Sequence, residues 1–317
     1  PGRRQFNTAL LFSLGAGLAP RSAFAAAPAA AATASPASLP ASSATSPAAK
    51  EWVARMHAGL TRIDAAAGGR LGVAVQDMHT GAIAALRGGE RFPMCSTFKL
   101  LVAALVLKRT EEKKENLGRR IVIRQADMVP NSPITKTHAA GEGMTVAELC
   151  AAAIAVSDNT AANLLLKSFG GPAALTHYVR SLGDTITRLD RIEPALNEAR
   201  PGDARDTTAP LAMLGNLRAL LLGEALAPAS RAQLIDWLKA TTTSARRLRA
   251  HLPAGWQAAD KTGTGERGTN NDIGILLPPD RAPLLVCVYL TNTKAPLEKS
   301  SEVVAAVGEL VVREAKA

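Results

Sequence analysis

The chain has 317 residues, of which 47% are hydrophobic and 20% are charged, and its formal net charge is +10. Such a composition is typical of globular proteins, and the length allows one large domain or two modest ones. Basic chains often bind nucleic acid, but here aromatic residues make up only 3% and do not alternate with lysine and arginine. We therefore expect a basic soluble protein with no nucleic-acid partner.

The N-terminus has the three parts of an export signal. Arg3 and Arg4 precede an apolar stretch over 8–19, and Ala23 to Ala25 form an A-x-A cleavage site. The paired arginines favour the twin-arginine route over a Sec signal. The stretch is too short to span a membrane, and no later segment is long and uncharged enough. We expect residues 1–25 to be removed on export to the periplasm, and no membrane span.

A linker is predicted between the signal and the folded part. Residues 26–47 are mostly alanine, proline and serine, which bury little apolar surface and favour disorder. A single folded domain is then expected over 48–317, as a monomer.

The first elements of this domain are a helix and a hairpin. A helical pattern begins at Ala49 and ends at Gly68 and Gly69. Strands are predicted over 71–77 and 82–88, and the residues between them, MHTG, are typical of a hairpin turn.

A mainly helical block follows, with helices predicted over 96–110, 146–156, 160–169, 172–182, 208–222 and 229–240. Three strands are predicted next, over 255–263, 271–279 and 283–292, and an amphipathic helix over 300–315 closes the chain. This order favours the α+β class: an antiparallel sheet flanked by the terminal helices, with an all-helical lobe inserted. We expect an α/β lobe over 48–87 and 241–317, a helical lobe over 88–240, and a site between them.

The cysteine and histidine spacings predict no metal site and no cofactor. Cys95, Cys150 and Cys287 are an odd number for an exported protein, so at least one thiol should stay free. Their spacings do not resemble a zinc motif. The histidines form no H-x-E or H-E-x-x-H grouping; they are His57, His79, His138, His177 and His251.

Ser96 and Lys99 stand near the head of an apolar run, FPMCSTFKLLVAALVL. Positions i and i+3 of a helix lie on the same face, so the hydroxyl and the amine can meet and form an activated nucleophile. A lone S-x-x-K also arises by chance in a chain of this length, and a lysine that snorkels to the surface is the alternative.

Three further motifs accompany the Ser–Lys pair. Ser157-Asp158-Asn159 follows a helical pattern, where a helix cap is the alternative interpretation. Lys261-Thr262-Gly263 ends a strand, where glycine permits close approach of another backbone and a simple turn is the alternative. The segment RIEPALN, 191–197, lies in a long irregular stretch of a kind that is often functional, with a solvated charged loop as the alternative.

S-x-x-K, S-D-N and K-T-G, in this order, resemble the signature of penicillin-recognising serine enzymes. The E-P-x-L-N segment between the second and third motifs is similar to that of class A β-lactamases, and the resemblance covers residues 50–315. It implies a serine β-lactamase/D,D-peptidase-like fold. It also implies hydrolysis of the β-lactam amide of penicillins and cephalosporins, and hence antibiotic resistance.

The resemblance implies roles for the reacting groups. Ser96 would attack the β-lactam carbonyl from a helix N-terminus, which favours developing negative charge. Either Lys99 or Glu193 would take the serine proton, and this choice stays open. For deacylation, Glu193 would act on a water held together with Asn197.

Other residues would bind the substrate and assist the departure of the lactam nitrogen. The backbone N–H groups of Ser96 and Thr264 would form the oxyanion hole. Ser157, tuned by Lys261, would pass a proton to the leaving nitrogen. The substrate's carboxylate and amide would contact Asn159, Thr262, Gly263 and Thr264.

Two family features concern the loop and the substrate carboxylate. Arg191 and Asp206 correspond to a pair that clamps the Glu193 loop, and Glu193–Pro194 resembles a peptide bond that is cis in the family. Asn270 stands where many relatives have an arginine, and Arg247 fits the alternative position for an arginine that pairs with the substrate's carboxylate.

Other positions depart from the family pattern. Asn131 stands where many relatives have a tyrosine or tryptophan at the mouth of the site. One family disulfide would join Cys95 to position 265, which is glycine here. Another uses the position of Cys150, but its partner position is Ala103. We therefore expect no disulfide.

Two other functions share part of this pattern. A D,D-peptidase has three of the motifs but lacks a deacylating carboxylate, so E-P-x-L-N argues against it. A β-lactam-sensing module without turnover is also disfavoured, because Lys99, Glu193 and Asn197 are all intact. The expected partner is therefore a small-molecule β-lactam.

Overall fold

The computed structural model describes residues 46–139 and 141–316. The predicted export signal over 1–25 and nearly all of the predicted linker lie outside the described residues.

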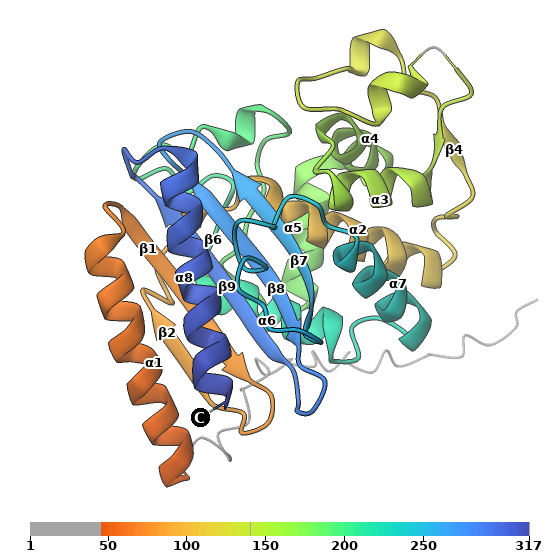
Figure 1. The fold of residues 1–317 in the computed structure, drawn as a ribbon. Helices are drawn as coiled ribbons and strands as arrows, with labels where there is room; N and C mark the ends of the chain where they lie inside the picture. Colours follow the sequence, from red (N-terminus) through yellow and green to blue (C-terminus); the bar gives the residue numbers. More distant parts are fainter. Residues whose placement is uncertain (1–45, 140, 317) are drawn as a thin grey trace, which may run out of the picture. The chain divides into compact units, whose positions relative to one another are not determined.

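A five-stranded antiparallel sheet forms the centre of the fold, in the order β2-β1-β9-β8-β7 (Figure 1). Its strands are β1 (Arg70–Asp77), β2 (Ile83–Leu86), β7 (Gln257–Thr264), β8 (Asn270–Leu277) and β9 (Leu284–Thr291). β1 and β2 pair as the hairpin that the MHTG turn predicts. β1 also pairs with β9, so the two ends of the chain meet in one sheet.

The terminal helices α1 (Pro47–Ala66) and α8 (Leu297–Lys316) lie side by side on one face of the sheet (Figure 1). Alternate residues of β9 point to opposite faces, as the period of a strand requires. Val286 and Val288 pack in the core under α1 and α8, with Trp52 of α1 and Leu310 of α8. Cys287, between the two valines, faces the other core. The sheet is therefore buried on both sides, and the predicted α+β class is confirmed.

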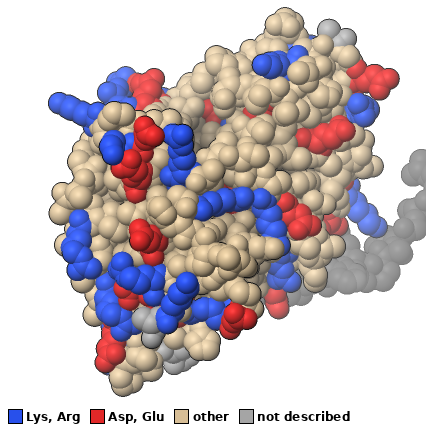
Figure 2. All heavy atoms as spheres, viewed as in Figure 1, with Lys and Arg blue, Asp and Glu red and all other residues tan. Residues whose placement is uncertain are grey.

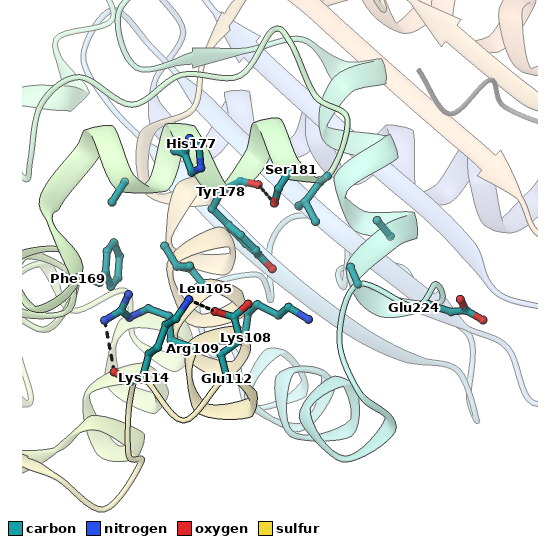
Figure 3. Close-up of a pocket in the computed structure, with 14 residues that line it drawn as sticks. Leu105, Lys108, Arg109, Glu112, Lys114, Phe169, His177, Tyr178, Ser181 and Glu224 are labelled. Carbon is teal, nitrogen blue, oxygen red and sulfur yellow. Dashed lines mark hydrogen bonds and ion pairs between the residues drawn. The ribbon is translucent and has the colours of Figure 1, made fainter. Parts of the chain in front are cut away.

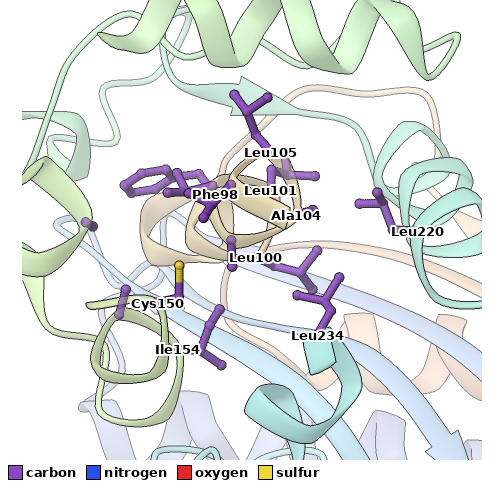
Figure 4. Packing of buried hydrophobic residues seen from close by; sticks show 14 of the residues in the cluster. Phe98, Leu100, Leu101, Ala104, Leu105, Cys150, Ile154, Leu220 and Leu234 are labelled. Atoms are coloured by element: carbon purple, nitrogen blue, oxygen red, sulfur yellow. The ribbon is translucent and has the colours of Figure 1, made fainter. Parts of the chain in front are cut away.

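The helices on the other side surround α2 (Phe98–Glu111). They are α3 (Val146–Ala155), α4 (Asn159–Phe169), α5 (Gly171–Ser181), α6 (Pro210–Leu221) and α7 (Pro228–Lys239). α2 is buried on all sides over Phe98–Leu107, as expected for a helix that is apolar around its whole circumference. Figure 4 shows Leu100 of α2 on the side of Cys150 and Ile154 of α3, and Leu101 on the opposite side of the helix with Leu105.

The sequence prediction differs from the structure at short elements. α2 begins at Phe98, and Ser96 lies in a preceding 3-10 turn, Cys95–Thr97, instead of in the α-helix. Four two-residue strands were not predicted, since two residues show no periodicity: β3 (Phe92–Pro93) with β6 (Thr207–Thr208), and β4 (Arg120–Ile121) with β5 (Met144–Thr145). Three further 3-10 turns cover Gln125–Asp127, Thr135–His138 and Ala195–Asn197.

The surface in view carries charges of both signs. Figure 2 shows lysine and arginine side chains interspersed with aspartate and glutamate on this face. Within the described part of the chain, none of the helices has the length and apolar character needed to cross a membrane.

Candidate active site

The Ser96 turn connects β3 to α2. Ser96 is nearly buried, and its Oγ donates a hydrogen bond to Oε1 of Glu193 at 2.9 Å. Cys95, just before it, has a φ of 45°, in the left-handed region that few non-glycine residues adopt. The neighbouring Met94 N–H donates to the carbonyl oxygen of Asp206 at 2.9 Å. The turn therefore places the serine hydroxyl directly against the carboxylate of the RIEPALN segment.

Lys99 is fully buried one turn further along α2, which contradicts the alternative of a snorkelling lysine. Its Nζ lies 3.1 Å from Oε1 of Glu193 and donates to Oδ1 of Asn159 at 2.6 Å. It also donates to the carbonyl oxygen of Ser157 at 2.8 Å and to its Oγ at 3.3 Å. Burial lowers the pKa of Lys99, while the Glu193 carboxylate opposes this shift.

The S-D-N motif serves two purposes at once. Asp158 caps α4 by accepting from the N–H of Ala161 at 2.9 Å, so the helix-cap interpretation is correct for this residue. Ser157 and Asn159, on either side, turn towards Lys99 instead. Ser157 has a φ of 59°, in the left-handed region that few non-glycine residues adopt.

Lys261 on β7 approaches Ser157 from the sheet. Its Nζ donates to Oγ of Ser157 at 3.0 Å and to the carbonyl oxygen of Thr262 at 2.8 Å. Burial, together with the positive charges of Lys99 and Arg247, lowers the pKa of Lys261 well below its ordinary value. The Ser157 hydroxyl thus lies between two buried amines.

Gly263 explains why β7 can pass so close to the Ser96 turn. A Cβ at this position would lie 2.7 Å from the carbonyl oxygen of Met94, closer than non-bonded atoms approach. The close approach expected of the glycine in K-T-G is therefore present, and the neighbour is the segment that carries the serine.

Arg191 and Asp206 join the two ends of the irregular segment that carries Glu193. Arg191 Nε lies 2.6 Å from Oδ2 of Asp206, whose Oδ1 accepts from the backbone N–H of Arg191 at 2.9 Å. The Glu193–Pro194 peptide bond is cis. Asn197 Nδ2 donates to Oε2 of Glu193 at 2.5 Å, so both carboxylate oxygens of Glu193 have partners.

Asn163 is a site residue that the sequence analysis missed. Its Oδ1 accepts from the backbone N–H of Glu193, and its Nδ2 donates to the Glu193 carbonyl oxygen, both at 2.9 Å. The only sequence signal was a polar residue within the apolar run AANLLL of α4.

Four of the residues expected to bind substrate lie on β7 or contact it: Thr262, Gly263, Thr264 and Arg247. Arg247 is buried, and its Nη2 donates to Oγ1 of Thr264 at 2.7 Å. Thr262 Oγ1 is 2.6 Å from Oγ1 of Thr243. Asn270 points away from this group, because its Nδ2 donates to hydroxyls of α8. Asn131 is exposed, and its Nδ2 donates to the carbonyl oxygen of Ser157 at 3.2 Å.

The three cysteines are buried free thiols. A Cβ on Gly265 would lie 2.5 Å from Sγ of Cys95, so the disulfide position of the family is adjacent here but holds a glycine. The described residues contain no group of three or more His, Cys, Asp or Glu side chains that could hold a metal ion.

A pocket of about 710 Å³ lies outside this group of residues (Figure 3). Its lining includes Leu105 and Arg109 of α2, Phe169 of α4 and Tyr178 of α5. None of the site residues predicted from the sequence lines it.

The sheet with its helical block, and S-x-x-K, S-D-N and K-T-G meeting in one buried cluster, define the class of penicillin-recognising serine enzymes. Comparisons with known proteins narrow this class. The family described as "Beta-lactamase enzyme family" matches residues 55–315.

The chain is 48% identical to beta-lactamase OXY-2 of Klebsiella oxytoca over 256 residues, which is 81% of this chain and 88% of that protein. It is 47% identical to beta-lactamase CTX-M-8 of Citrobacter amalonaticus, over 80% of this chain and 86% of the relative. The solved structure of an ancestral (GNCA) class A beta-lactamase is 59% identical with a TM-score of 0.80, covering 81% of this chain and 99% of that one.

The chain therefore belongs to the class A β-lactamase family and is a β-lactam-hydrolysing, antibiotic-resistance enzyme. The alternatives of a D,D-peptidase and of a module without turnover are set aside.

Proposed function

We propose that the enzyme hydrolyses penicillins and cephalosporins through an acyl-enzyme on Ser96, which a water activated by Glu193 then releases. The observation that carries this proposal is the position of the Glu193 carboxylate. It lies 2.9 Å from the Ser96 hydroxyl and 3.1 Å from the Lys99 amine, and its other oxygen accepts from Asn197.

In acylation, Ser96 Oγ forms a bond to the lactam carbonyl carbon and gives up its proton. Ser96 Oγ donates to Oε1 of Glu193, and the Lys99 amine lies 3.1 Å from the same oxygen, so the proton would pass to Glu193 or through it to Lys99. The N–H groups of Ser96 and Thr264 would stabilise the oxyanion, and the loss of one such donor typically costs about 3 kcal/mol.

The lactam C–N bond then breaks, and its nitrogen needs a proton. Ser157 would supply it, because its hydroxyl contacts both buried amines, Lys99 at 3.3 Å and Lys261 at 3.0 Å. Either amine can replace the proton that Ser157 gives away, and the lowered pKa of each favours that transfer.

In deacylation, Glu193 would take a proton from a water that attacks the ester carbonyl, and Asn197 would help to orient that water. The ester C–O bond then breaks, and Ser96 leaves as the alcohol with the proton that Glu193 took from the water. Asn163 holds the backbone of Glu193 on both sides, which fixes the carboxylate during both half-reactions.

Substrate binding is assigned to residues around β7. Thr262 and Thr264 would receive the substrate's carboxylate with the help of Arg247, which touches Thr264. Asn159 would contact the substrate's side-chain amide, and the exposed Asn131 would line the entrance. From the N-terminal sequence we also propose export to the periplasm. We further propose that the enzyme is a monomer.

The test compares the purified enzyme with its Ser96→Ala variant. The parent should turn over nitrocefin and form a penicilloyl adduct in intact-mass spectrometry, and the variant should do neither. An undiminished adduct in Ser96→Ala would exclude Ser96 as the nucleophile. A stoichiometric burst without turnover in the parent would exclude catalytic hydrolysis.

A further inference from the structure

We propose that Asn271, on β8, is a positioning residue whose side-chain amide holds the Ser96 turn in its reactive conformation. The inference rests on the proposed function, because it concerns acylation of the same serine. No motif of the sequence includes Asn271.

Asn271 connects the sheet to the segment just before the nucleophile. The residue is fully buried, and its Nδ2 donates to the carbonyl oxygen of Pro93 at 2.9 Å and to that of Met94 at 3.1 Å. These carbonyls lie three and two residues before Ser96. A single amide group therefore fixes the backbone orientation at the entrance to the turn.

The turn needs such support, because Cys95 has a φ of 45°. A non-glycine residue in the left-handed region is strained and keeps that conformation only where the surroundings determine it. Thr97 helps from the α2 side by donating from its N–H and its Oγ1 to the Met94 carbonyl oxygen. Asn271 acts on the same carbonyl from the sheet side.

Asn271 also connects the turn to the strand that carries the second oxyanion N–H group. Its own carbonyl oxygen accepts from Arg247 Nη1 at 2.8 Å, and the same nitrogen donates to the carbonyl of Gly263 at 3.2 Å. Asn271 pairs with Gly263 in the sheet register. The N–H groups of Ser96 and Thr264 thus belong to two segments that Asn271 joins, and their separation defines the oxyanion hole.

Asn270 offers a matched control one residue away. It is equally buried, its Nδ2 also donates two hydrogen bonds, and its Oδ1, like that of Asn271, has no partner among the described residues. Its side chain points the other way, to the hydroxyls of Ser300 and Ser301 on α8. Replacing either asparagine by leucine removes two donated bonds, but only Asn271→Leu removes them from the Ser96 turn.

The experiment measures the acylation rate constant by quenched-flow mass spectrometry with a slowly deacylating β-lactam, in the parent, Asn271→Leu and Asn270→Leu. Infrared difference spectra of the acyl-enzyme report the ester carbonyl stretch, which rises when hydrogen bonds in the oxyanion hole weaken. We expect Asn271→Leu to acylate about tenfold to hundredfold more slowly, since small displacements of reacting groups cost this much. Its carbonyl stretch should rise, while Asn270→Leu should match the parent in both readouts at a similar loss of thermal stability.

Equal acylation rates and carbonyl frequencies in the two leucine variants would overturn the inference. If Asn271→Leu does not fold, Asn271→Asp and Asn270→Asp are compared instead. Aspartate keeps the size of asparagine but places an acceptor where Asn271 donates to the two carbonyls. Equal acylation rates in this second pair would also overturn the inference. A parent that forms no adduct on Ser96 would refute the proposed function itself, which separates the two failures.

Discussion

At the scale of single residues, Glu193 contacts groups that the proposed mechanism uses at different stages. Its Oε1 faces Ser96 and Lys99, and its Oε2 faces Asn197. Removing this carboxylate takes away the base for water but leaves Lys99 as an alternative base for the serine. Without its ionic partner 3.1 Å away, the buried Lys99 would also lose its proton more easily.

Glu193→Ala should therefore accumulate acyl-enzyme and show a burst followed by turnover that is about 10²–10⁴-fold slower. Quenched-flow mass spectrometry with a good penicillin substrate measures both half-reactions. Asp203→Ala, which removes a carboxylate paired with Arg205 in the same segment, is the control and should behave like the parent.

Turnover of Glu193→Ala at the parent rate would show that another group activates the water. Loss of acylation as well as turnover would show that Glu193 is also needed to deprotonate Ser96. That result would favour Glu193 over Lys99 as the acylation base.

Arg247 is a second residue whose contribution to substrate binding can be measured separately. Its guanidinium is buried beside Thr264, and a hydrogen-bonded pair of arginine and carboxylate is a strong contact. Arg247→Ala should lower kcat/KM for benzylpenicillin by about one to two orders of magnitude, equivalent to about 1.4 kcal/mol for each factor of ten.

The neighbouring Arg246 provides the control for this experiment. It is exposed and pairs with Glu298, so Arg246→Ala should leave kcat/KM within about twofold of the parent, as exposed ion pairs contribute little. If the two variants have equal kinetics, the substrate carboxylate is held by other groups, with Lys294 and Lys299 as the candidates to test.

At the scale of elements, α2 carries Lys99 and forms the centre of the larger core. Leu101 is fully buried in the hydrophobic cluster around α2 (Figure 4). Leu101→Ala should lower the free energy of unfolding by about 2–5 kcal/mol, since the cavity can collapse only in part. Urea unfolding followed by circular dichroism measures the change.

Leu211, on α6, is the exposed counterpart for this test. Leu211→Ala should change the unfolding free energy by no more than about 0.5 kcal/mol. Equal losses in the two variants would show that burial around α2 does not decide stability.

At the scale of the whole molecule, a buried carboxyl group in the sheet lowers the stability of the protein at neutral pH. Asp272 of β8 is fully buried, and burial together with the nearby Asp260 raises its pKa well above the ordinary value. Its contribution to stability is fully present below the pKa of the unfolded chain and is lost as the pH rises through the folded-state pKa. Asp272 accepts from Ser244 Oγ at 2.6 Å, a bond that an asparagine oxygen can also accept.

Asp272→Asn should therefore raise Tm more at about pH 8 than at about pH 4. Asp203→Asn provides a test with the opposite sign. Its hydrogen bonds with Arg205 lower the pKa of Asp203, so that substitution should lower Tm at neutral pH and lose its effect in acid. Thermal unfolding of both variants is measured from about pH 8 to about pH 2, because the contribution of Asp203 is lost only below the ordinary aspartate pKa of about 3.9. A pH-independent change in Asp272→Asn would contradict the argument.

The sequence by itself determined the class of fold and named the candidate reacting groups. Helices and long strands follow from local periodicity, and the MHTG turn from its own residues, so their positions were predicted within a few residues. The S-x-x-K, S-D-N, E-P-x-L-N and K-T-G segments carry their chemistry in contiguous residues. The start of α2 was misplaced because the 3-10 turn at Cys95–Thr97 is held by distant contacts.

Only the tertiary structure decided how these segments meet. The contact between Ser96 and Glu193 joins residues 97 positions apart, and that between Asn271 and Met94 joins residues 177 positions apart. No local pattern records such distances, which is why Asn163 and Asn271 escaped the sequence analysis. Long-range packing also decides where Asn270 and Arg247 lie. The Asn270 side chain on β8 points to α8, whereas the packing of the chain before β7 brings Arg247 to Thr264. The sequence identifies the candidate site residues, and long-range packing decides which of them are in contact.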